Sequence, residues 1–232
     1  MYRAKIPKSQ QADKTPYTAY NPHTIPISER NWSEPFVRII SIDPGTKNFC
    51  IRVEERPKDP TSGLIKGLLY ERLTLTNQLN EEMLYSVYDV LTEFLDNHLD
   101  LFLTCHIVIM ERQVPLNYRA VRISQHALSY FMFKLKNNPL LPLIMEIDSK
   151  LKGKQLGAPQ GINENQLKKW SVQKATELLT IRRDEFSLTK LRKATKKDDL
   201  ADTVCQIEAL FSYLQWPLTQ APSIIKLTIN SS

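Results

Sequence analysis

Four carboxylates in the sequence stand where they could share metal ions. Asp43 and Glu111 each come directly after an apolar run. Asp199 and Asp202 lie three residues apart at the start of an amphipathic segment, so they project to one side of a helix, off its apolar stripe. Clustered carboxylates cannot all stay ionised without a cation, and Mg²⁺ prefers such hard oxygen ligands. Two Mg²⁺ ions roughly 3.5–4 Å apart could clamp a phosphodiester, and Mn²⁺ could substitute.

Each of these residues also has an ordinary structural interpretation. An Asp before Pro-Gly is usually a turn residue, and two Asp at a helix start are often caps. The combined order of strand–Asp, strand–Glu and helix–Asp-x-x-Asp favours a joint role. Asp198 leaves the register of the last pair open, because Asp198 and Asp202 also share a helix face at four-residue spacing.

The hydrophobic pattern predicts the elements that position these carboxylates. Three apolar segments joined by short loops indicate an antiparallel meander, and later segments alternate between helical and strand periods, which favours parallel strands. The expected strands are 36–42, 49–53, 67–75, 103–110 and 143–147, and the expected helices begin near 83, 118, 164 and 199. We expect polar loops at 54–66 and 149–162. The predicted fold is therefore α/β, with a five-stranded mixed sheet (three antiparallel strands, then two parallel) flanked by helices.

These elements fall in one predicted domain, residues 36–216. Residues 1–35 are rich in proline and polar groups without any period, so we expect a flexible or loosely docked arm. Residues 217–232 form a tail whose partly alternating apolar residues could add an edge strand or pair with a partner.

Composition narrows the class of protein. Of 232 residues, 42% are hydrophobic, enough for a packed core, and Lys and Arg outnumber Asp and Glu by 31 to 25, which weakly favours a polyanionic partner. The three cysteines match no zinc motif, and their apolar surroundings predict buried thiols in a reducing, intracellular compartment. No apolar run approaches the length of a membrane span, so we expect no membrane association.

Three motifs resemble those of the RuvC-like Holliday-junction resolvases. Asp43-Pro-Gly-Thr-Lys-Asn48 resembles the first motif, in the form favoured by the poxvirus and mitochondrial branch. Glu111, followed by Gln113 and Asn117, resembles the second motif, and the run Lys-Lys-Asp-Asp-Leu-Ala-Asp at 196–202 resembles the last. The likeness extends in the correct order from about residue 37 to 214.

The resemblance implies an RNase H-like fold and a Mg²⁺-dependent endodeoxyribonuclease of DNA recombination and repair. Such an enzyme resolves four-way (Holliday) junctions as a homodimer, by paired nicks. Asp43, Glu111, Asp199 and Asp202 would then be both the catalytic residues and the ligands of two Mg²⁺ ions. Large DNA viruses encode such enzymes, so a viral origin is expected. The cytoplasm of an infected host cell, or the nucleus, is then favoured over the mitochondrion.

Basic side chains near the carboxylates are candidates for binding branched DNA, with an affinity that falls steeply with salt. They are Lys47, Arg112, Arg119, Arg122, Lys150, Lys152, Lys154, Lys196 and Lys197. The segment 118–136, with Tyr130, Phe131 and Phe133, is a candidate dimer interface, although these residues would serve equally well in the core.

Two other classes of function remain open. One is a noncatalytic nucleic-acid-binding module on the same fold, which the four acidic positions disfavour. The other is an actin-like ATPase, since Asp-x-Gly-Thr also follows the first strand there. The chain is short for the two domains that such ATPases need, and it shows no second phosphate loop.

Overall fold

A six-stranded sheet runs through the centre of the computed structural model, which describes residues 16–20, 32–59, 61–76 and 85–215. The strands are β1 (Tyr17–Ala19), β2 (Phe36–Asp43), β3 (Phe49–Pro57), β4 (Lys66–Leu73), β5 (Ile107–Glu111) and β6 (Leu143–Ile147). The helices are α1 (Tyr85–Asn97), α2 (Leu99–Phe102), α3 (Tyr118–Lys134), α4 (Leu151–Leu156), α5 (Glu164–Ile181), α6 (Glu185–Lys193) and α7 (Lys197–Leu214).

The strand order is β1-β6-β5-β2-β3-β4. Strands β2, β3 and β4 form an antiparallel meander, whereas β5 pairs parallel with β2 and β6 pairs parallel with β5. The predicted arrangement of three antiparallel strands followed by two parallel ones is confirmed. The structure adds one strand, β1, which pairs antiparallel with β6 at the edge of the sheet.

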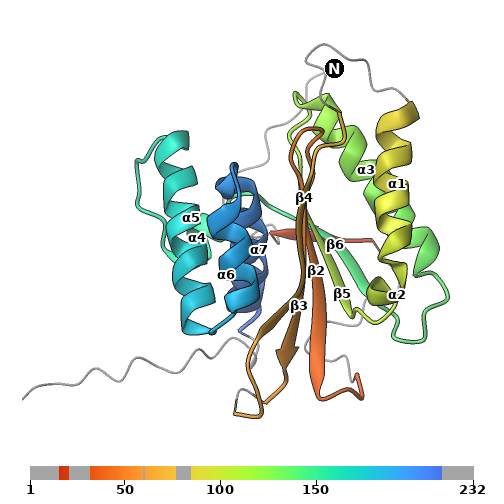
Figure 1. Cartoon of the computed structure of the whole chain (residues 1–232), viewed down its shortest axis with the longest axis horizontal. Helices are drawn as coiled ribbons and strands as arrows, with labels where there is room; N and C mark the ends of the chain where they lie inside the picture. The colour runs from red at the N-terminus through yellow and green to blue at the C-terminus, as the bar shows by residue number, and fades with distance from the viewer. Residues whose placement is uncertain (1–15, 21–31, 60, 77–84, 216–232) are drawn as a thin grey trace, which may run out of the picture.

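Helices cover both faces of the sheet (Figure 1). Helices α1, α2 and α3 lie on one side, and α4, α5, α6 and α7 lie on the other. Because side chains alternate along a strand, Ile40 and Ile42 of β2 pack in the cluster beneath α1 and α3. Ile39 packs instead with Ile207 and Leu210 of α7. The side chains of the odd-numbered residues of β2 therefore point to the face of the sheet that α7 covers.

The ends of the predicted elements differ from the structure in several places. The fourth predicted strand begins later, at Ile107, because residues 99–102 form a helix. The expected loop at 149–162 contains α4, and α6 was not anticipated. The expected loop at 54–66 begins too early, since β3 continues to Pro57 with Glu54 and Arg56 fully buried.

Part of the predicted N-terminal arm is ordered. Residues 17–19 form β1, and Trp32 is buried, with its indole N–H donating to the carbonyl of Leu140 at 2.9 Å. The remaining arm residues, 1–15 and 21–31, and the predicted tail, 217–232, lie outside the described residues. Among the helices that are described, none is long and apolar enough to cross a membrane.

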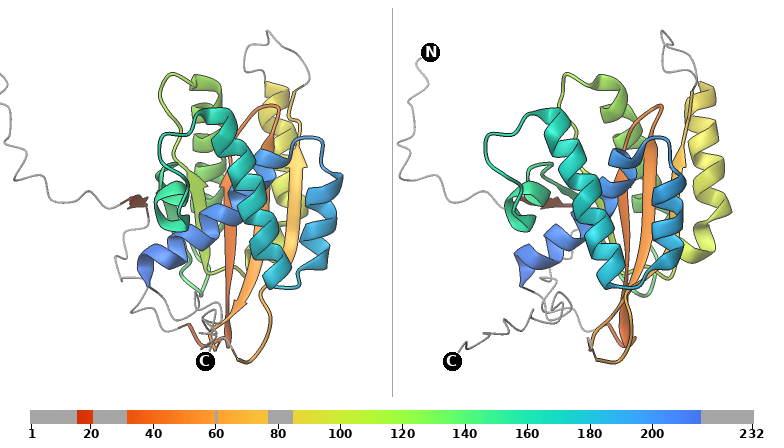
Figure 2. Two further views of the ribbon diagram at one scale, coloured as in Figure 1. Left: turned by 90° about the vertical axis from the view of Figure 1, so that its left-hand side faces the viewer. Right: turned by 60° about the vertical axis from the view of Figure 1, so that its left-hand side comes forward.

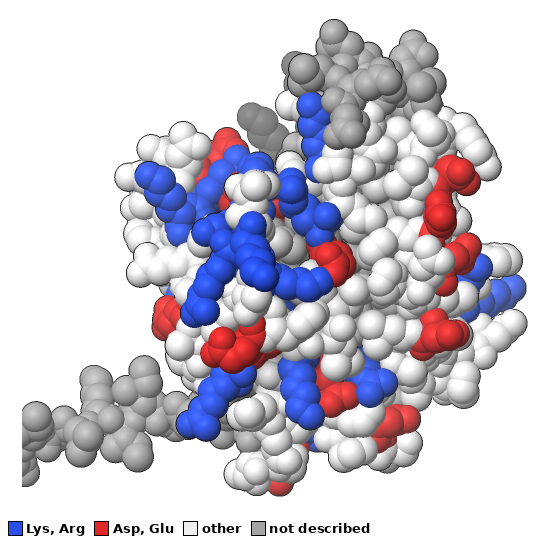
Figure 3. Space-filling model, in the orientation of Figure 1, with Lys and Arg blue, Asp and Glu red and all other residues white. Residues whose placement is uncertain are grey.

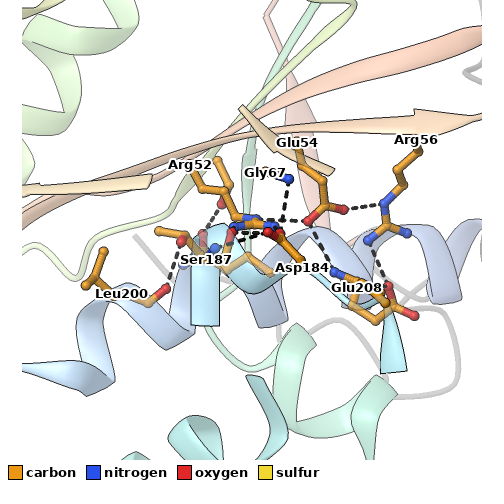
Figure 4. A network of polar contacts seen from close by, with 12 residues as sticks. Arg52, Glu54, Arg56, Gly67, Asp184, Ser187, Leu200 and Glu208 are labelled. Atoms are coloured by element: carbon orange, nitrogen blue, oxygen red, sulfur yellow. Dashed lines mark hydrogen bonds and ion pairs between the residues drawn. The ribbon is translucent and has the colours of Figure 1, made fainter. Parts of the chain in front are cut away.

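Buried ion pairs attach β3 to the helices that pack on one face of the sheet (Figure 4). The guanidinium of Arg52 contacts Glu54 and Asp184, each at 2.9 Å, and Arg56 contacts Glu54 at 2.5 Å. Arg56 also reaches Glu208 of α7 at 2.8 Å, and Arg182 contacts Glu54 at 3.2 Å. Three cations thus meet three carboxylates, which is the pairing that lets charge be buried at all.

Candidate active site

The first two carboxylates leave the sheet at the same edge. β2 and β5 are parallel neighbours, and Ile42 lies opposite Met110, so Asp43 and Glu111 follow at adjacent strand ends. Ile109 shares the α7-facing cluster with Ile39. Alternation then places Asp43, four residues after Ile39, and Glu111, two residues after Ile109, on that same face. Asp43 and Glu111, which come from separate stretches of sequence, therefore lie side by side because β2 and β5 pair in this register.

Helix α7 brings the remaining carboxylates to this edge. It begins at Lys197 and packs across β2 and β3, burying Leu200, Val204 and Ile207. Burial raises the pKa of Asp43 well above its ordinary value. The charges of Glu111, Asp202 and Asp199 raise it further. Asp43 therefore lies within electrostatic range of the other three predicted carboxylates.

Asp198 and Asp199 face different surroundings. The carboxylate of Asp198 binds the ammonium of Lys196 at 2.8 Å, which holds the pKa of Asp198 below its ordinary value although burial opposes this. The pKa of Asp199 is raised, first by burial and then by the neighbouring Asp198. Its Oδ2 is buried and accepts no hydrogen bond in the described part of the chain, although Lys196 lies 3.8 Å away. Asp199 is thus the better placed of the two to take a cation.

A buried lysine lies between two of the carboxylates. The ammonium of Lys152, on α4, is 3.3 Å from Glu111 Oε2 and 2.5 Å from Asp202 Oδ2, and only 9% of its side chain is exposed. Burial alone would lower the pKa of Lys152, but Glu111 and Asp202 raise it above its ordinary value. Lys152 therefore differs from the expectation of a DNA-binding surface lysine, because its charge is directed into the carboxylate cluster.

Neutral side chains hold two of the carboxylates in place. Gln206 Nε2 donates to Glu111 Oε2 at 2.9 Å, and Ser41 Oγ donates to Gln206 Oε1 at 2.8 Å. Ser171 of α5 donates to Asp202 Oδ1. Sequence reasoning missed all three residues. Ser41 within an apolar strand and Gln206 beside an apolar helix stripe were the available signals, since buried polar groups almost always have a partner.

The donor chemistry fits a hard divalent cation. Every candidate ligand is a carboxylate, and Asp199 Oδ2 is buried without a hydrogen-bond donor. As they stand, however, no three Asp, Glu, His or Cys side chains among the described residues are grouped tightly enough to bind one metal ion together.

The other predicted DNA-binding residues differ in how far they are exposed. Arg112, Arg122, Lys150, Lys154 and Lys197 are exposed, whereas the rest of the set is half-buried. Lys and Arg side chains also gather over α6 and the neighbouring end of α7 (Figure 3). The last turn of α6 contributes three cations that sequence reasoning did not single out. They are Lys190, Arg192 and Lys193.

The predicted dimer-interface residues separate into two groups. Tyr130 and Phe131 are buried in the core, with their rings 5.5 Å apart, whereas Phe133 is 78% exposed beside the exposed Met132.

The three cysteines are buried and unpaired, as predicted.

Comparison with solved structures identifies the fold. The Holliday junction resolvase of fowlpox virus matches 77% of this chain and 99% of its own, with 17% identity and a TM-score of 0.50. The same viral enzyme in complex with Holliday junction DNA matches with a TM-score of 0.52 and 19% identity, over 77% of this chain and 97% of its own. The yeast mitochondrial Holliday junction resolvase matches 81% of this chain and 84% of its own, with 21% identity and a TM-score of 0.51.

This chain has the RNase H-like fold of the Holliday junction resolvases. The RuvC-like resemblance that the three motifs indicated is confirmed at the level of the fold, in the poxvirus and mitochondrial form.

Relatives by sequence come from iridoviruses. The uncharacterized protein 97L of Invertebrate iridescent virus 3 is 28% identical over 177 residues, which cover 75% of this chain and 82% of the relative. The uncharacterized protein 170L of Invertebrate iridescent virus 6 is 29% identical over 139 residues, covering 53% of this chain and 56% of that relative. No family model matches the sequence.

Proposed function

We propose that this chain is a Mg²⁺-dependent, structure-selective DNA endonuclease that resolves four-way junctions by paired nicks. One observation carries the proposal: Asp43 and Glu111 end the paired strands β2 and β5, and the buried Lys152 contacts both Glu111 and Asp202, which follows Asp199 by three residues on α7. The structural neighbours supply support, since one of them was crystallised with Holliday junction DNA. An all-carboxylate cluster rimmed by lysine and arginine suits phosphodiester hydrolysis on a polyanion.

In this proposal the four carboxylates hold the metal. When bound, Mg²⁺ supplies activation of a water molecule and stabilisation of the leaving oxygen. The protein's own contribution is to hold the ligands before DNA arrives. Gln206, itself held by Ser41, orients the Glu111 carboxylate, and Ser171 orients that of Asp202. Such support keeps ligands in place and is typical of metal sites.

Lys152 has a second role in the proposal. Its ammonium balances Glu111 and Asp202 in the metal-free protein, and so prevents the carboxylates from repelling one another apart. With metal bound, that positive charge remains beside the site, where it would stabilise the negative charge that develops on a scissile phosphate.

The decisive experiment is cleavage of a synthetic four-way junction, with forked and linear duplexes of the same sequence as comparison substrates. We expect Mg²⁺-dependent paired nicks in the junction alone. Asp43→Asn should abolish cleavage while junction binding persists. Asp89→Asn, which removes an exposed carboxylate on α1, is the matched control and should cut normally.

The outcomes separate the competing functions. Tight junction binding by the wild type, without cutting in Mg²⁺ or Mn²⁺, would support a noncatalytic binding module. Metal-dependent ATP hydrolysis would support the ATPase. Equal cutting by wild type and Asp43→Asn would place the chemistry elsewhere.

A homodimer is part of the same proposal, because symmetric nicks need two sites related by a two-fold axis. The exposed Met132 and Phe133 on α3 provide an apolar surface for it. A monomeric mass by light scattering at micromolar concentration, with and without junction DNA, would contradict the dimer.

A further inference from the structure

A cleft lies beside α4, the helix that carries Lys152. Its volume is about 610 Å³, within the range of small-ligand sites. β1 and Arg112 form one wall, α4 forms another, and Tyr213 near the end of α7 contributes a third. Both views of Figure 2 show β1 beside α4 and the last turns of α7. Segments far apart in the sequence thus enclose one space large enough for a nucleotide.

The cleft is lined by an excess of positive charge. Arg112, Lys150 and Lys154 line it, against one carboxylate, that of Asp148. That carboxylate already accepts a hydrogen bond from the backbone N–H of Lys150 at 2.9 Å. Arg112 is anchored to the wall by a 2.5 Å hydrogen bond from Nη2 to Thr18 Oγ1. A phosphate group is the ligand that this set of donors favours.

Two tyrosine rings lie at the same cleft. Tyr17 of β1 and Tyr213 of α7 pack edge to face, with ring centroids 6.4 Å apart and planes at 76°. Both rings are half-buried, so each presents part of its surface to the cleft. Aromatic rings beside phosphate-binding cations form the usual platform for an unstacked nucleic-acid base.

Helix α4 connects the cleft to the proposed catalytic edge. Lys152 points from this helix to Glu111 and Asp202, whereas Lys150 and Lys154, four residues apart, line the cleft. Arg112 directly follows Glu111 in the sequence and lies in the cleft wall. The cleft therefore shares α4 with Lys152 and begins one residue along the chain from Glu111.

The wall formed by β1 is built by specific contacts. Tyr17 lies opposite Ile147 in the β1–β6 ladder, and the N–H of Asp148 donates to the carbonyl of Pro16 at 2.7 Å. The hydroxyl of Tyr20 donates to the buried carboxylate of Glu146. This segment precedes the residues that carry the three motifs, so the cleft depends on a part of the chain outside them.

We propose that this cleft binds one unstacked nucleotide of the DNA strand that passes the carboxylates. The phosphate lies among Arg112, Lys150 and Lys154, and the base lies against Tyr17 or Tyr213. The inference rests on the proposed function in that its ligand is DNA, but it is a statement about binding and does not need cleavage.

The first test measures binding of a short oligothymidylate to the full chain as a function of salt. The double variant Lys150→Gln/Lys154→Gln removes two exposed cations from the cleft. We expect weaker binding and a salt slope smaller by up to about 0.7, the value for one single-strand phosphate contact. The control Lys66→Gln/Lys136→Gln removes two exposed cations at the opposite end of the sheet and should leave the slope unchanged. Equal slopes for the two double variants would overturn the proposal.

The second test locates the base. An oligonucleotide carrying 5-iododeoxyuridine, irradiated with the wild-type protein, should cross-link to peptides that contain Tyr17 or Tyr213. Tyr213→Leu should weaken oligothymidylate binding by about 5- to 150-fold, the usual range for one stacked base. Cross-links confined to other peptides, or unchanged affinity, would overturn the assignment of the base.

The two proposals fail separately. If wild-type protein cuts four-way junctions but the cleft variants bind and cut as the control does, the cleft inference is wrong and the nuclease stands. If the protein binds the oligonucleotide through the cleft but never cuts a junction, the nuclease proposal fails and the cleft remains.

Discussion

At the scale of single residues, the electrostatic surroundings distinguish neighbours that the sequence could not. Asp198 and Asp199 are adjacent and equally acidic, yet Asp198 is compensated by Lys196 at 2.8 Å while Asp199 faces the other carboxylates with an unsatisfied oxygen. Of two buried carboxylates, the one without a close cation is stabilised more by a bound metal ion. We therefore assign the ligand role to Asp199.

This assignment predicts opposite results for two neighbouring substitutions. Asp199→Asn should lower the rate of junction cleavage by on the order of 100-fold or more, equivalent to about 2.7 kcal/mol in the barrier. Asp198→Asn removes only a partly exposed ion pair and should change the rate by less than about fivefold. Single-turnover cleavage rates decide the matter, and the reverse ranking would reassign the ligand.

Lys152 yields a prediction about metal removal. Replacing it by Met leaves Glu111 and Asp202 without their buried partner, so the free energy of unfolding should fall by about 3–5 kcal/mol in EDTA. Mg²⁺ bound by the same carboxylates would restore part of the missing positive charge. We therefore expect a smaller loss in Mg²⁺, measured by urea unfolding. Equal losses in both buffers would show that the carboxylates bind no metal in the variant.

At the scale of elements, one close approach sets the position of α6. The N–H of Gly67, on β4, donates to Asp184 Oδ2 at 3.0 Å, and Asp184 also caps α6 through the N–H of Ser187. A Cβ at position 67 would lie 2.4 Å from Ser187 Oγ and 2.9 Å from Asp184 Oδ2. Only glycine lets the strand come this close to the start of the helix.

The packing predicts that Gly67→Ala lowers the free energy of unfolding by about 1–3 kcal/mol, as overpacking of a filled site does. Gly63→Ala is the matched control, because a Cβ there meets its nearest atom only at 4.0 Å. Urea denaturation of both variants tests this. A Gly67→Ala protein as stable as the control would mean that α6 shifts away from β4 without cost.

At the scale of the whole molecule, two kinds of contact hold the second helix layer on the sheet. Apolar clusters beneath α5 and α7 supply one, and the buried ion pairs along β3 supply the other. Burial on its own would raise the pKa of Glu54, but Arg56, Arg182 and Arg52 together lower it below its ordinary value. Because folding lowers the pKa of Glu54, its ion pairs stabilise the folded state fully above the pKa that Glu54 has in the unfolded chain. This stabilisation is lost as the pH falls below that value.

The pH dependence of Glu54→Gln follows from that sign. At pH 7 the variant should be less stable than wild type by about 3–5 kcal/mol, since it leaves buried arginines unpaired. The difference should shrink below pH of about 4, where the unfolded wild type begins to take up the proton. Glu93→Gln, on the exposed face of α1, should show neither effect. A difference that is the same at pH 7 and pH 3 would contradict this account.

The sequence by itself determined the sheet and the carboxylate positions. Continuous, β-branched apolar runs marked β2 and β5, their ends placed Asp43 and Glu111, and the helical stripe after Asp199 marked α7. These features depend on local patterns that burial imposes on neighbouring residues. The arrangement of β2 to β6 could therefore be predicted from these patterns, and the motif resemblance implied the RNase H-like fold, whereas the edge strand β1 was not predicted.

Only the tertiary structure decided which polar side chains are buried and what compensates them. Lys152 resembles a surface lysine and Arg52 an exposed strand residue, because the partners that make their burial favourable lie far away in the sequence. Lys152 meets Asp202 across 50 positions, and Arg52 meets Asp184 across 132. Burying a charge is unfavourable until such a partner is in contact. The sequence near a charged residue does not contain that contact, whereas the folded chain does.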